Sequence, residues 1–324
     1  MSPTSKARFA FFIVVTSTFT AGSTFAQSYP AKPIRIVVAL APGGGVDTTA
    51  RLIGQKLFEA WGQQVVAENR PGAGGTIASE IVVRSAPDGY TLLMDSTAHA
   101  ITPGLYKLSY DPINDFTPIT LAVLAPSVLV VHPSLRVNSV KELLALARAR
   151  PNQLLFSSAG NGSPQHLALE LLKLMTGVRM VHVPYKGTAP SITDLIGGRV
   201  STTAASTVST MPHVRAGRLR ALAVISSRRS VGEPQLPTVA EAGVPGYAVD
   251  TWYGLFAPAG TPKEIIARLY EETAKALAQP DARGRLLSMG LEPVASTPEQ
   301  FSAYVREEAQ KWGKVIRQAG VRAE

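Results

Sequence analysis

The feature that most constrains the fold of this chain is a repeated order of β-branched strand, glycine loop and helix. Residues 34–40 form an apolar, β-branched run that ends at the glycines of residues 43–45, and apolar residues then recur at helical spacing. A second strand is expected at residues 64–67, before a second glycine loop at residues 72–75, and a third at residues 90–94. This alternation with short connections predicts an α/β fold with mostly parallel sheets and right-handed crossovers.

The rest of the chain continues the same alternation. It predicts strands at residues 127–131, 154–157, 180–183, 200–204 and 221–225, and helices at residues 139–150, 262–277 and 298–318, with another helix beginning near Pro164. The chain has 324 residues, the length of about two domains, and no long linker divides it. We therefore expect two lobes, residues 27–124 with 226–324 and residues 125–225, with a ligand cleft between them.

Residues 1–26 have the pattern of a cleavable secretory signal peptide. Lys6 and Arg8 precede an uncharged apolar run at residues 9–22, and Thr24-Phe25-Ala26 supplies small residues where a signal peptidase reads them. The apolar run is shorter than a membrane-spanning helix needs, so a membrane anchor is the less favoured alternative. No later segment approaches the roughly 18 apolar residues of a spanning helix. We therefore expect a soluble mature protein exported to the periplasm.

Composition and motifs exclude several classes of site. The chain contains no cysteine, which excludes disulfides, thiolate metal ligands and a cysteine nucleophile. Its five histidines are isolated, without the i, i+4 pairing of a helical metal site. The sequence also contains no P-loop, no G-x-S-x-G elbow and no H-E-x-x-H motif. We therefore expect no metal and no cofactor.

The charge of the chain favours small anions over nucleic acid. The net charge is +9 and falls by two, to +7, once Lys6 and Arg8 are removed with the signal peptide. Basic residues are scattered, and the densest groups, at residues 148–150 and 228–229, are expected on solvated surfaces. Because basic and aromatic residues do not interleave, we expect no nucleic-acid partner. The excess of positive charge does attract small anions.

The glycine loops are candidate anion-binding sites. A dinucleotide fingerprint fails at the first loop, because Thr48 stands where the third glycine of G-x-G-x-x-G belongs. A glycine loop at a helix N-terminus nevertheless exposes backbone N–H groups at the positive end of the helix. Such loops occur at residues 43–45, 72–75, 158–163 and 186–188. Tight turns are the alternative for any one of them, but several loops at the ends of successive strands favour a carboxylate site.

The same residues resemble a known family. Residues 42–51 have the P-G-G-x-x-D-x-x-A-R pattern of the tripartite tricarboxylate transporter substrate-binding proteins, also called the Bug family. The match continues in order along the mature chain at residues 69–75, 87–93, 166–171, 182–187, 219–224, 237–243 and 252–255. It departs at Leu40-Ala41, where the family often has an aromatic residue and a proline. The resemblance implies a two-lobed periplasmic binding protein that closes on a small carboxylate and delivers it to a membrane permease of one small and one large subunit.

The resemblance and the chemistry of the loops together give candidate site residues. The first loop would donate backbone N–H groups, and Asp47 would cap the helix after it or also accept from the ammonium of an amino-acid ligand. His166, in the first turn of the helix after the loop at residues 158–163, would be a donor behind the residues that touch the ligand, or a packing residue. Lys186 would add a positive charge or simply be exposed. Trp252 and Tyr253 would line the cleft or belong to the core. The ligand-binding candidates are Gly43, Gly44, Gly45, Asp47, Ser157, Ser158, Gly160, Asn161, Gly162, His166, Lys186, Thr188 and Trp252.

We therefore predict a monomeric, non-catalytic solute-binding protein for a di- or tricarboxylate, an amino acid or an aromatic acid. A periplasmic sensor that binds the same ligand for a signalling receptor is an alternative that the sequence cannot separate from transport. A hydrolase with Ser158 or Ser163 as nucleophile and His166 as base is a further alternative. The sequence offers no third group that would orient the imidazole.

Overall fold

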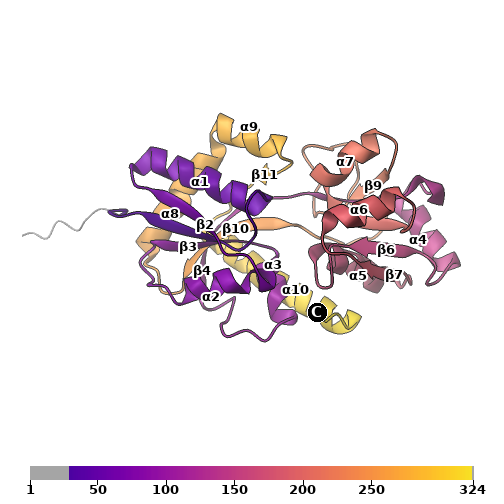
Figure 1. The fold of residues 1–324 in the computed structure, drawn as a ribbon, viewed down its shortest axis with the longest axis horizontal. Coiled ribbons are helices and arrows are strands. Elements are labelled where there is room, and N and C mark those ends of the chain that lie inside the picture. Colours follow the sequence, from indigo (N-terminus) through magenta and orange to yellow (C-terminus); the bar gives the residue numbers. More distant parts are fainter. Residues whose placement is uncertain (1–28, 323–324) are drawn as a thin grey trace, which may run out of the picture.

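The computed structural model of the protein describes residues 29–322. The predicted signal peptide, residues 1–26, lies outside the described residues. The described chain forms two α/β lobes that lie side by side and are joined by extended segments (Figure 1). Each lobe is a sheet flanked by helices, so the expected two-lobed α/β architecture is confirmed.

The first lobe is built on a six-stranded sheet with the order β11-β4-β10-β3-β1-β2. Its strands are β1 (Ile34–Val38), β2 (Val65–Asn69), β3 (Thr91–Ser96), β4 (Phe116–Leu124), β10 (Trp252–Pro258) and β11 (Glu292–Pro293). Its helices are α1 (Gly45–Trp61), α2 (Thr76–Val83), α3 (Ala98–Ile101), α8 (Lys263–Ala278), α9 (Pro280–Ser288) and α10 (Pro298–Ala319), with short 3-10 turns at Ala73–Gly75 and Thr102–Gly104. Strand β1 pairs parallel with β2 and β3, whereas β10 is antiparallel to β3 and β4.

The second lobe has a five-stranded sheet with the order β7-β6-β8-β5-β9. Its strands are β5 (Ser127–Val131), β6 (Leu155–Ser158), β7 (Val181–Pro184), β8 (Thr202–Ser206) and β9 (Arg220–Val224). Its helices are α4 (Val140–Ala149), α5 (Pro164–Thr176), α6 (Thr188–Ile196) and α7 (Thr207–Arg215), with a 3-10 turn at Pro133–Leu135. Strands β6, β7 and β8 run parallel, and β5 is antiparallel to β8 and β9.

Strands β4 and β10, which lie in the middle of the first sheet, are not among the predicted strands, and helices α7 and α9 are not among the predicted helices. Strand β4 contains Pro118, and the register between the two strands shifts where Pro118 pairs with Phe256. Strand β10 contains Gly254, whose missing side chain leaves room for the ring of Phe301. Proline removes a ladder donor and glycine weakens a strand, so both residues obscure the strand pattern in the sequence.

The chain passes between the lobes twice. The first crossing joins β4 to β5, near the expected boundary. After β9, residues 226–250 stay with the second lobe. The N–H of Val249 donates to the carbonyl of Ile225 at 2.8 Å, and the hydroxyl of Tyr247 donates to the carbonyl of Ala168 at 3.0 Å. On these contacts we propose that the second lobe extends to about residue 250, beyond residue 225 where the sequence suggested it ends, and that the second crossing leads directly into β10.

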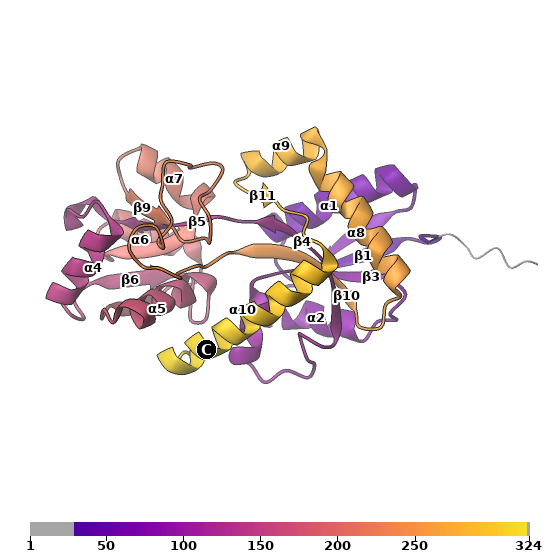
Figure 2. The same cartoon turned by 180° about the vertical axis from the view of Figure 1, so that it is seen from behind.

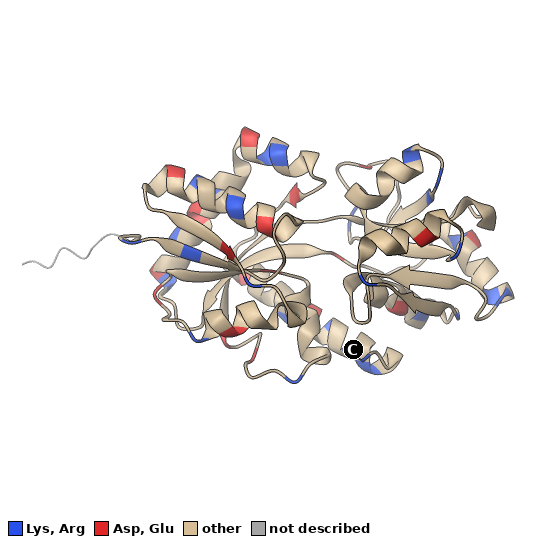
Figure 3. Cartoon of the chain, viewed as in Figure 1, with Lys and Arg blue, Asp and Glu red and all other residues tan. Residues whose placement is uncertain are grey.

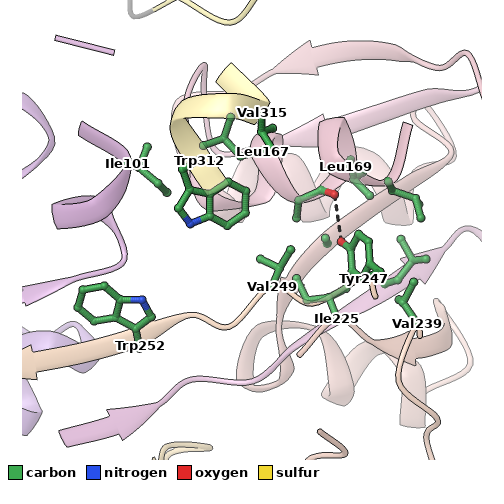
Figure 4. Packing of buried hydrophobic residues seen from close by; sticks show 14 of the residues in the cluster. Ile101, Leu167, Leu169, Ile225, Val239, Tyr247, Val249, Trp252, Trp312 and Val315 are labelled. Carbon is green, nitrogen blue, oxygen red and sulfur yellow. Dashed lines mark hydrogen bonds between the residues drawn. The ribbon is translucent and has the colours of Figure 1, made fainter. Parts of the chain in front are cut away.

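Helix α10 ties the two lobes together. It packs against α3 of the first lobe and α5 of the second, and both ribbon views show it reaching from one lobe to beneath the other (Figures 1 and 2). Trp312 and Val315 of α10 lie beside Leu167 of α5, in a buried cluster that continues to Trp252 (Figure 4). The indole N–H of Trp312 donates to Glu308 Oε2 at 2.8 Å. The apolar core is therefore continuous from one lobe to the other.

Strand polarity brings the loops that follow the parallel strands to the interface. Strand β10 enters the first lobe at Trp252, and Tyr253 pairs with Ser96 at the carboxyl end of β3. Strands β1 and β2 are parallel to β3, so their carboxyl ends lie at the same edge. In the second lobe, Ser127 follows the first crossing and pairs with Ser206 at the end of β8, and β6 and β7 run parallel to β8. The glycine loops of both sheets therefore face the opposite lobe.

Candidate functional site

Helix α1 begins with N–H groups that no side chain of the described residues caps. Gly44 is its N-cap residue, with φ −78° and ψ 171°. The first N–H groups of a helix have no partner within it, and they lie at the positive end of the helix dipole. Gly44 is exposed, and an added Cβ would meet only the Ala41 carbonyl, at 3.7 Å. The start of α1 can therefore donate to an anion.

Asp47 is not the N-cap of α1, contrary to the expectation, because it lies within the first turn of the helix, three residues after Gly44. Its Oδ2 accepts from the N–H of Gly43 at 2.9 Å, and its Oδ1 accepts from Arg51 Nε and Asn69 Nδ2, both at 2.9 Å. Burial alone would raise the pKa of this carboxyl, but the hydrogen bonds from Arg51, Gly43 and Asn69 lower it below its ordinary value. Asp47 thus fastens the loop after β1 to the end of β2.

The aromatic pair at the start of β10 divides between core and loop. Trp252 is fully buried and packs edge-on against Phe301, with ring centroids 5.4 Å apart. Tyr253 lies beneath Gly45, where an added Cβ would be 2.7 Å from the tyrosine ring. Burial raises the pKa of Tyr253 to about 12. In this conformation Tyr253, and not Trp252, supports the first glycine loop.

The second glycine loop of the first lobe lies against the first loop. Gly75 is the N-cap of α2, again without a side-chain cap from the described residues. An added Cβ on Gly75 would be 3.3 Å from the side chain of Ala39 and 3.3 Å from both carboxylate oxygens of Asp95. Asp95 is buried and accepts from the N–H of Ser96 at 2.7 Å. The loops after β1 and β2 therefore form one surface at the edge of the sheet.

In the second lobe, the loop after β6 is folded around Ser158. The Ser158 hydroxyl accepts from the N–H of Gly160 at 3.1 Å and donates to the carbonyl of the same residue at 3.0 Å. Gly160 and Gly162 have φ of +132° and +73°, which residues with a side chain rarely adopt. Ser157 points away from the loop, because its hydroxyl accepts from Ser191 Oγ at 2.7 Å. The hydroxyls of Ser157 and Ser158 are thus both engaged inside the lobe.

Two stacked imidazoles lie behind this loop. His166 Nδ1 accepts from the N–H of Gly162 at 3.1 Å, and His182 Nε2 lies 2.6 Å from Ser158 Oγ. The two rings stack with centroids 3.7 Å apart and planes 10° apart. His182 is not among the candidates named from the sequence, although it lies within the motif at residues 182–187. In the hydrolase hypothesis His166 would be the base for Ser158, but the partner of Ser158 is His182.

Helix α6 repeats the arrangement found at α1. Its N-cap is Gly187, with φ +112°, and no side chain of the described residues caps it. The N–H of Gly187 donates to the carbonyl of Ala159 at 3.1 Å, and Thr188 Oγ1 accepts from Gln165 Nε2 at 3.1 Å. Lys186 is exposed immediately before this turn. The candidates Lys186 and Thr188 therefore lie beside the loop at residues 158–163.

The serine-capped helices of the second lobe contrast with the glycine-capped ones. Ser163 caps α5 by accepting from the N–H of His166 at 3.3 Å, and Ser206 caps α7 by accepting from the N–H of Ser209 at 3.4 Å. Among the described elements at the interface, the starts of α1, α2 and α6 therefore keep backbone donors that side chains leave available. One of these lies in the second lobe and two in the first.

A cleft of about 180 Å³ lies between the two sets of loops. The first lobe contributes Gly74, Ala98, Thr102 and Tyr106, among other residues, and the second contributes residues 159–164, which include the candidates Gly160, Asn161 and Gly162. The lobes also touch here, since an added Cβ on Gly162 would collide with the side chain of Leu105. The walls of this cleft therefore come from both lobes, but residues 43–47 and 186–188 are not among the residues that line it.

A larger cavity of about 510 Å³ lies between α7 and α9. Its walls include two buried carboxylates, Glu233 and Glu292. Glu292 accepts from Ser230 Oγ at 2.8 Å and lies 3.7 Å from the guanidinium of Arg228, across the boundary between the lobes. Arg228, expected on a plain solvated surface, thus lies at an interlobe contact. Glu233 is paired with Arg215 at 2.6 Å and Glu292 with Arg228, so both carboxylates have cationic partners. The start of α7 in this wall is capped by Ser206. The described residues that line this cavity therefore present no uncapped helix start, and we favour the glycine loops as the carboxylate site.

Charge elsewhere on the molecule is mixed. Basic and acidic residues are interspersed over both lobes (Figure 3). Within residues 29–322, no helix is long and apolar enough to cross a membrane. The same residues contain no group of three or more side chains suited to hold a metal ion.

A family model and a curated relative both match most of the chain. Residues 49–321 match the family model described as the tripartite tricarboxylate transporter family receptor. The chain is 37% identical to protein BugT of Bordetella pertussis over 300 residues, covering 92% of each chain.

Two solved structures from Rhodopseudomonas palustris are also similar. One contains adipate; it is 38% identical, has a TM-score of 0.76, and the match covers 91% of this chain and 100% of that one. The other is MatC with bound malate; it is 35% identical, has a TM-score of 0.72, and the match covers 89% of this chain and 100% of that one.

Proposed function

The chain belongs to the tripartite tricarboxylate transporter family receptors, and on this premise we propose that it captures a small carboxylate between its lobes and delivers it to a membrane permease. Members of this family are solute-binding receptors and not enzymes. Two similar proteins were solved with adipate and with malate, both dicarboxylates, which supports a dicarboxylate as the first candidate ligand here.

One observation carries the proposal. Helices α1 and α6 begin at glycines on opposite lobes, and neither has a side-chain cap among the described residues. A glycine at this position leaves the first backbone N–H groups of the helix available. In α5 and α7, by contrast, a serine side chain accepts from one of these N–H groups. Available donors at the positive end of a helix are suited to a carboxylate.

This arrangement suits a ligand with a charge at each end. One carboxylate would accept from N–H groups at the start of α1, and the other would accept from the start of α6, with Lys186 nearby as a source of positive charge. A ligand held by both lobes stabilises the closed form relative to the open one, because only the closed form makes both sets of contacts. The two chain crossings, before β5 and before β10, would act as the hinge.

Transport and sensing remain distinct roles for the same binding event. The family supports delivery to a permease and a periplasmic location, and the predicted signal peptide agrees with export. A sensor for a membrane receptor would use the same cleft. Growth of a deletion strain on the identified ligand, with and without the permease genes, separates the two roles.

A thermal-shift panel tests the proposed function. Purified residues 27–324 would be melted with malate, adipate, citrate, glutamate and nicotinate, and with adipamide as an uncharged match for adipate. A ligand at a hundredfold excess over its Kd stabilises the folded state by about 2.7 kcal/mol. We expect at least one of the acids to raise Tm and adipamide not to do so. Equal effects of adipate and adipamide, or no shift with any acid, would contradict a carboxylate receptor.

A further inference from the structure

Ser158, His166 and His182 form a polar network behind the loop at residues 158–163. The proposed function assigns no role to this network. Ser158 is fully buried, and His166 is 6% exposed. The rings of Phe156, His182 and His166 form one stack, with centroid separations of 4.9 Å and 3.7 Å. Imidazoles stacked this closely in a partly buried site need a reason beyond filling space, because each brings two ring nitrogens that must find partners.

One nitrogen of each ring contacts the loop, that of His166 directly and that of His182 through the Ser158 hydroxyl. His166 Nδ1 accepts from the N–H of Gly162 at 3.1 Å. His182 Nε2 lies 2.6 Å from Ser158 Oγ, and that hydroxyl binds both the N–H and the carbonyl of Gly160. The network therefore holds the two loop residues with positive φ, which are also the two whose backbone would otherwise have the most freedom.

The surroundings of the stack favour a neutral His182. Burial, the neighbouring His166 and Lys173 together lower the pKa of His182 to about 4, although Glu170 acts in the opposite direction. Glu170 Oε1 lies 3.6 Å from His166 Nε2 and 2.7 Å from Lys173 Nζ. Burial would raise the pKa of Glu170, but His166 and Lys173 lower it, so it balances the lysine charge as a carboxylate. A neutral His182 can stack on His166 without charge repulsion.

We infer that Ser158, His166 and His182 are positioning residues that hold the loop at residues 159–163 in the shape that forms the second-lobe wall of the cleft. This inference rests on the proposed function for its consequence on affinity. The network holds the N–H groups of Gly160 and Gly162 in hydrogen bonds. The loop residues that line the cleft are therefore ordered before a ligand binds. A wall that is already ordered loses less entropy when a ligand binds, so the ligand binds more tightly.

Four variants test the inference. Ser158→Ala removes the central hydroxyl, and His182→Phe keeps a stacked ring but removes the bond to Ser158. His182→Gln places an amide nitrogen near the position of Nε2 and should restore that bond. Ser191→Ala is the matched control, because it also deletes a buried hydroxyl bond, from Ser191 to Ser157, but one that lies away from the loop.

Two measurements are made on each purified protein. Amide hydrogen exchange of the peptide covering residues 159–166 needs no ligand, and this peptide excludes Ser157, the partner of the control residue. Calorimetry with malate and adipate gives Kd. We expect Ser158→Ala and His182→Phe to speed exchange of this peptide about fivefold to tenfold, the effect of losing one hydrogen bond. We expect Kd to weaken by a similar factor, with His182→Gln close to the parent and Ser191→Ala unchanged in both measurements.

The outcomes separate this inference from the proposed function. If the parent binds none of the acids in the panel, the proposed function fails, while the exchange data still decide whether the network holds the loop. Parent-like exchange in His182→Phe would overturn the inference. Equal acceleration in Ser191→Ala, or failure of His182→Gln to restore exchange, would also overturn it, because the effect would then be general loosening of the lobe.

Discussion

Replacement of Gly44 by valine is the sharpest single test of how the carboxylate is held. Gly44 has φ −78°, which any residue adopts, and an added Cβ would meet nothing closer than the Ala41 carbonyl at 3.7 Å. Neither the backbone conformation nor the neighbouring atoms therefore oppose a side chain at this position. Gly44→Val should therefore fold normally while its side chain obstructs the approach of a ligand to the start of α1.

The magnitude follows from the bonds that would be lost. The start of α1 offers N–H groups that no described side chain caps. Hydrogen bonds to a charged partner are each worth about 1.5–3 kcal/mol. Loss of two such bonds would weaken binding by roughly two to four orders of magnitude.

Calorimetry with the acid that gives the largest thermal shift measures the effect. Gly284→Val is the matched control, because Gly284 is also exposed and an added Cβ there meets no atom within 4 Å. Gly284 lies in α9, away from the glycine loops. We expect a parent-like Tm for both variants and a large loss of affinity for Gly44→Val alone. A parent-like Kd for Gly44→Val would refute the assignment of α1 as a carboxylate donor.

Three further predictions concern stability, export and closure. Asp47→Asn should lower the free energy of unfolding by about 1.5–3 kcal/mol in urea at pH 7, because a buried, charge-assisted network is lost. The folded state lowers the pKa of Asp47 below 3.8, so this difference should be full above that pH and shrink as the pH falls through the folded-state value. Intact mass of the periplasmic protein should give an N-terminus near Gln27, and full-length chain in the membrane pellet would contradict export. Small-angle scattering should show a smaller radius of gyration with saturating ligand, and an unchanged radius would argue against a hinged cleft.

Regular elements with a clean hydrophobic pattern could be predicted from the sequence. The expected strand at residues 127–131 is β5, and the helix expected at 298–318 is α10, within one residue at its end. Strands β4 and β10 were missed because Pro118 and Gly254 interrupt the pattern that identifies a strand. The extent of the second lobe also escaped prediction, since residues 226–250 contain no regular element that would mark their attachment to β9.

Residue types in the loops were predictable, but their hydrogen-bond partners were not. A glycine loop identifies possible donors, yet only the fold shows that α1 and α6 lack side-chain caps while α5 has one in Ser163. Asp47 looked like a helix cap because aspartate is favoured there, but the tertiary contacts with Arg51 and Asn69 gave it another role. Those partners come from different elements, so no local pattern could reveal them.

The most direct test of a carboxylate held between two lobes is a crystal structure of the protein with the acid that the thermal-shift panel identifies. We predict carboxylate oxygens within about 3 Å of main-chain nitrogens at the start of α1 in one lobe and of α6 in the other. A ligand in the cavity between α7 and α9, or one that touches a single lobe, would contradict the account.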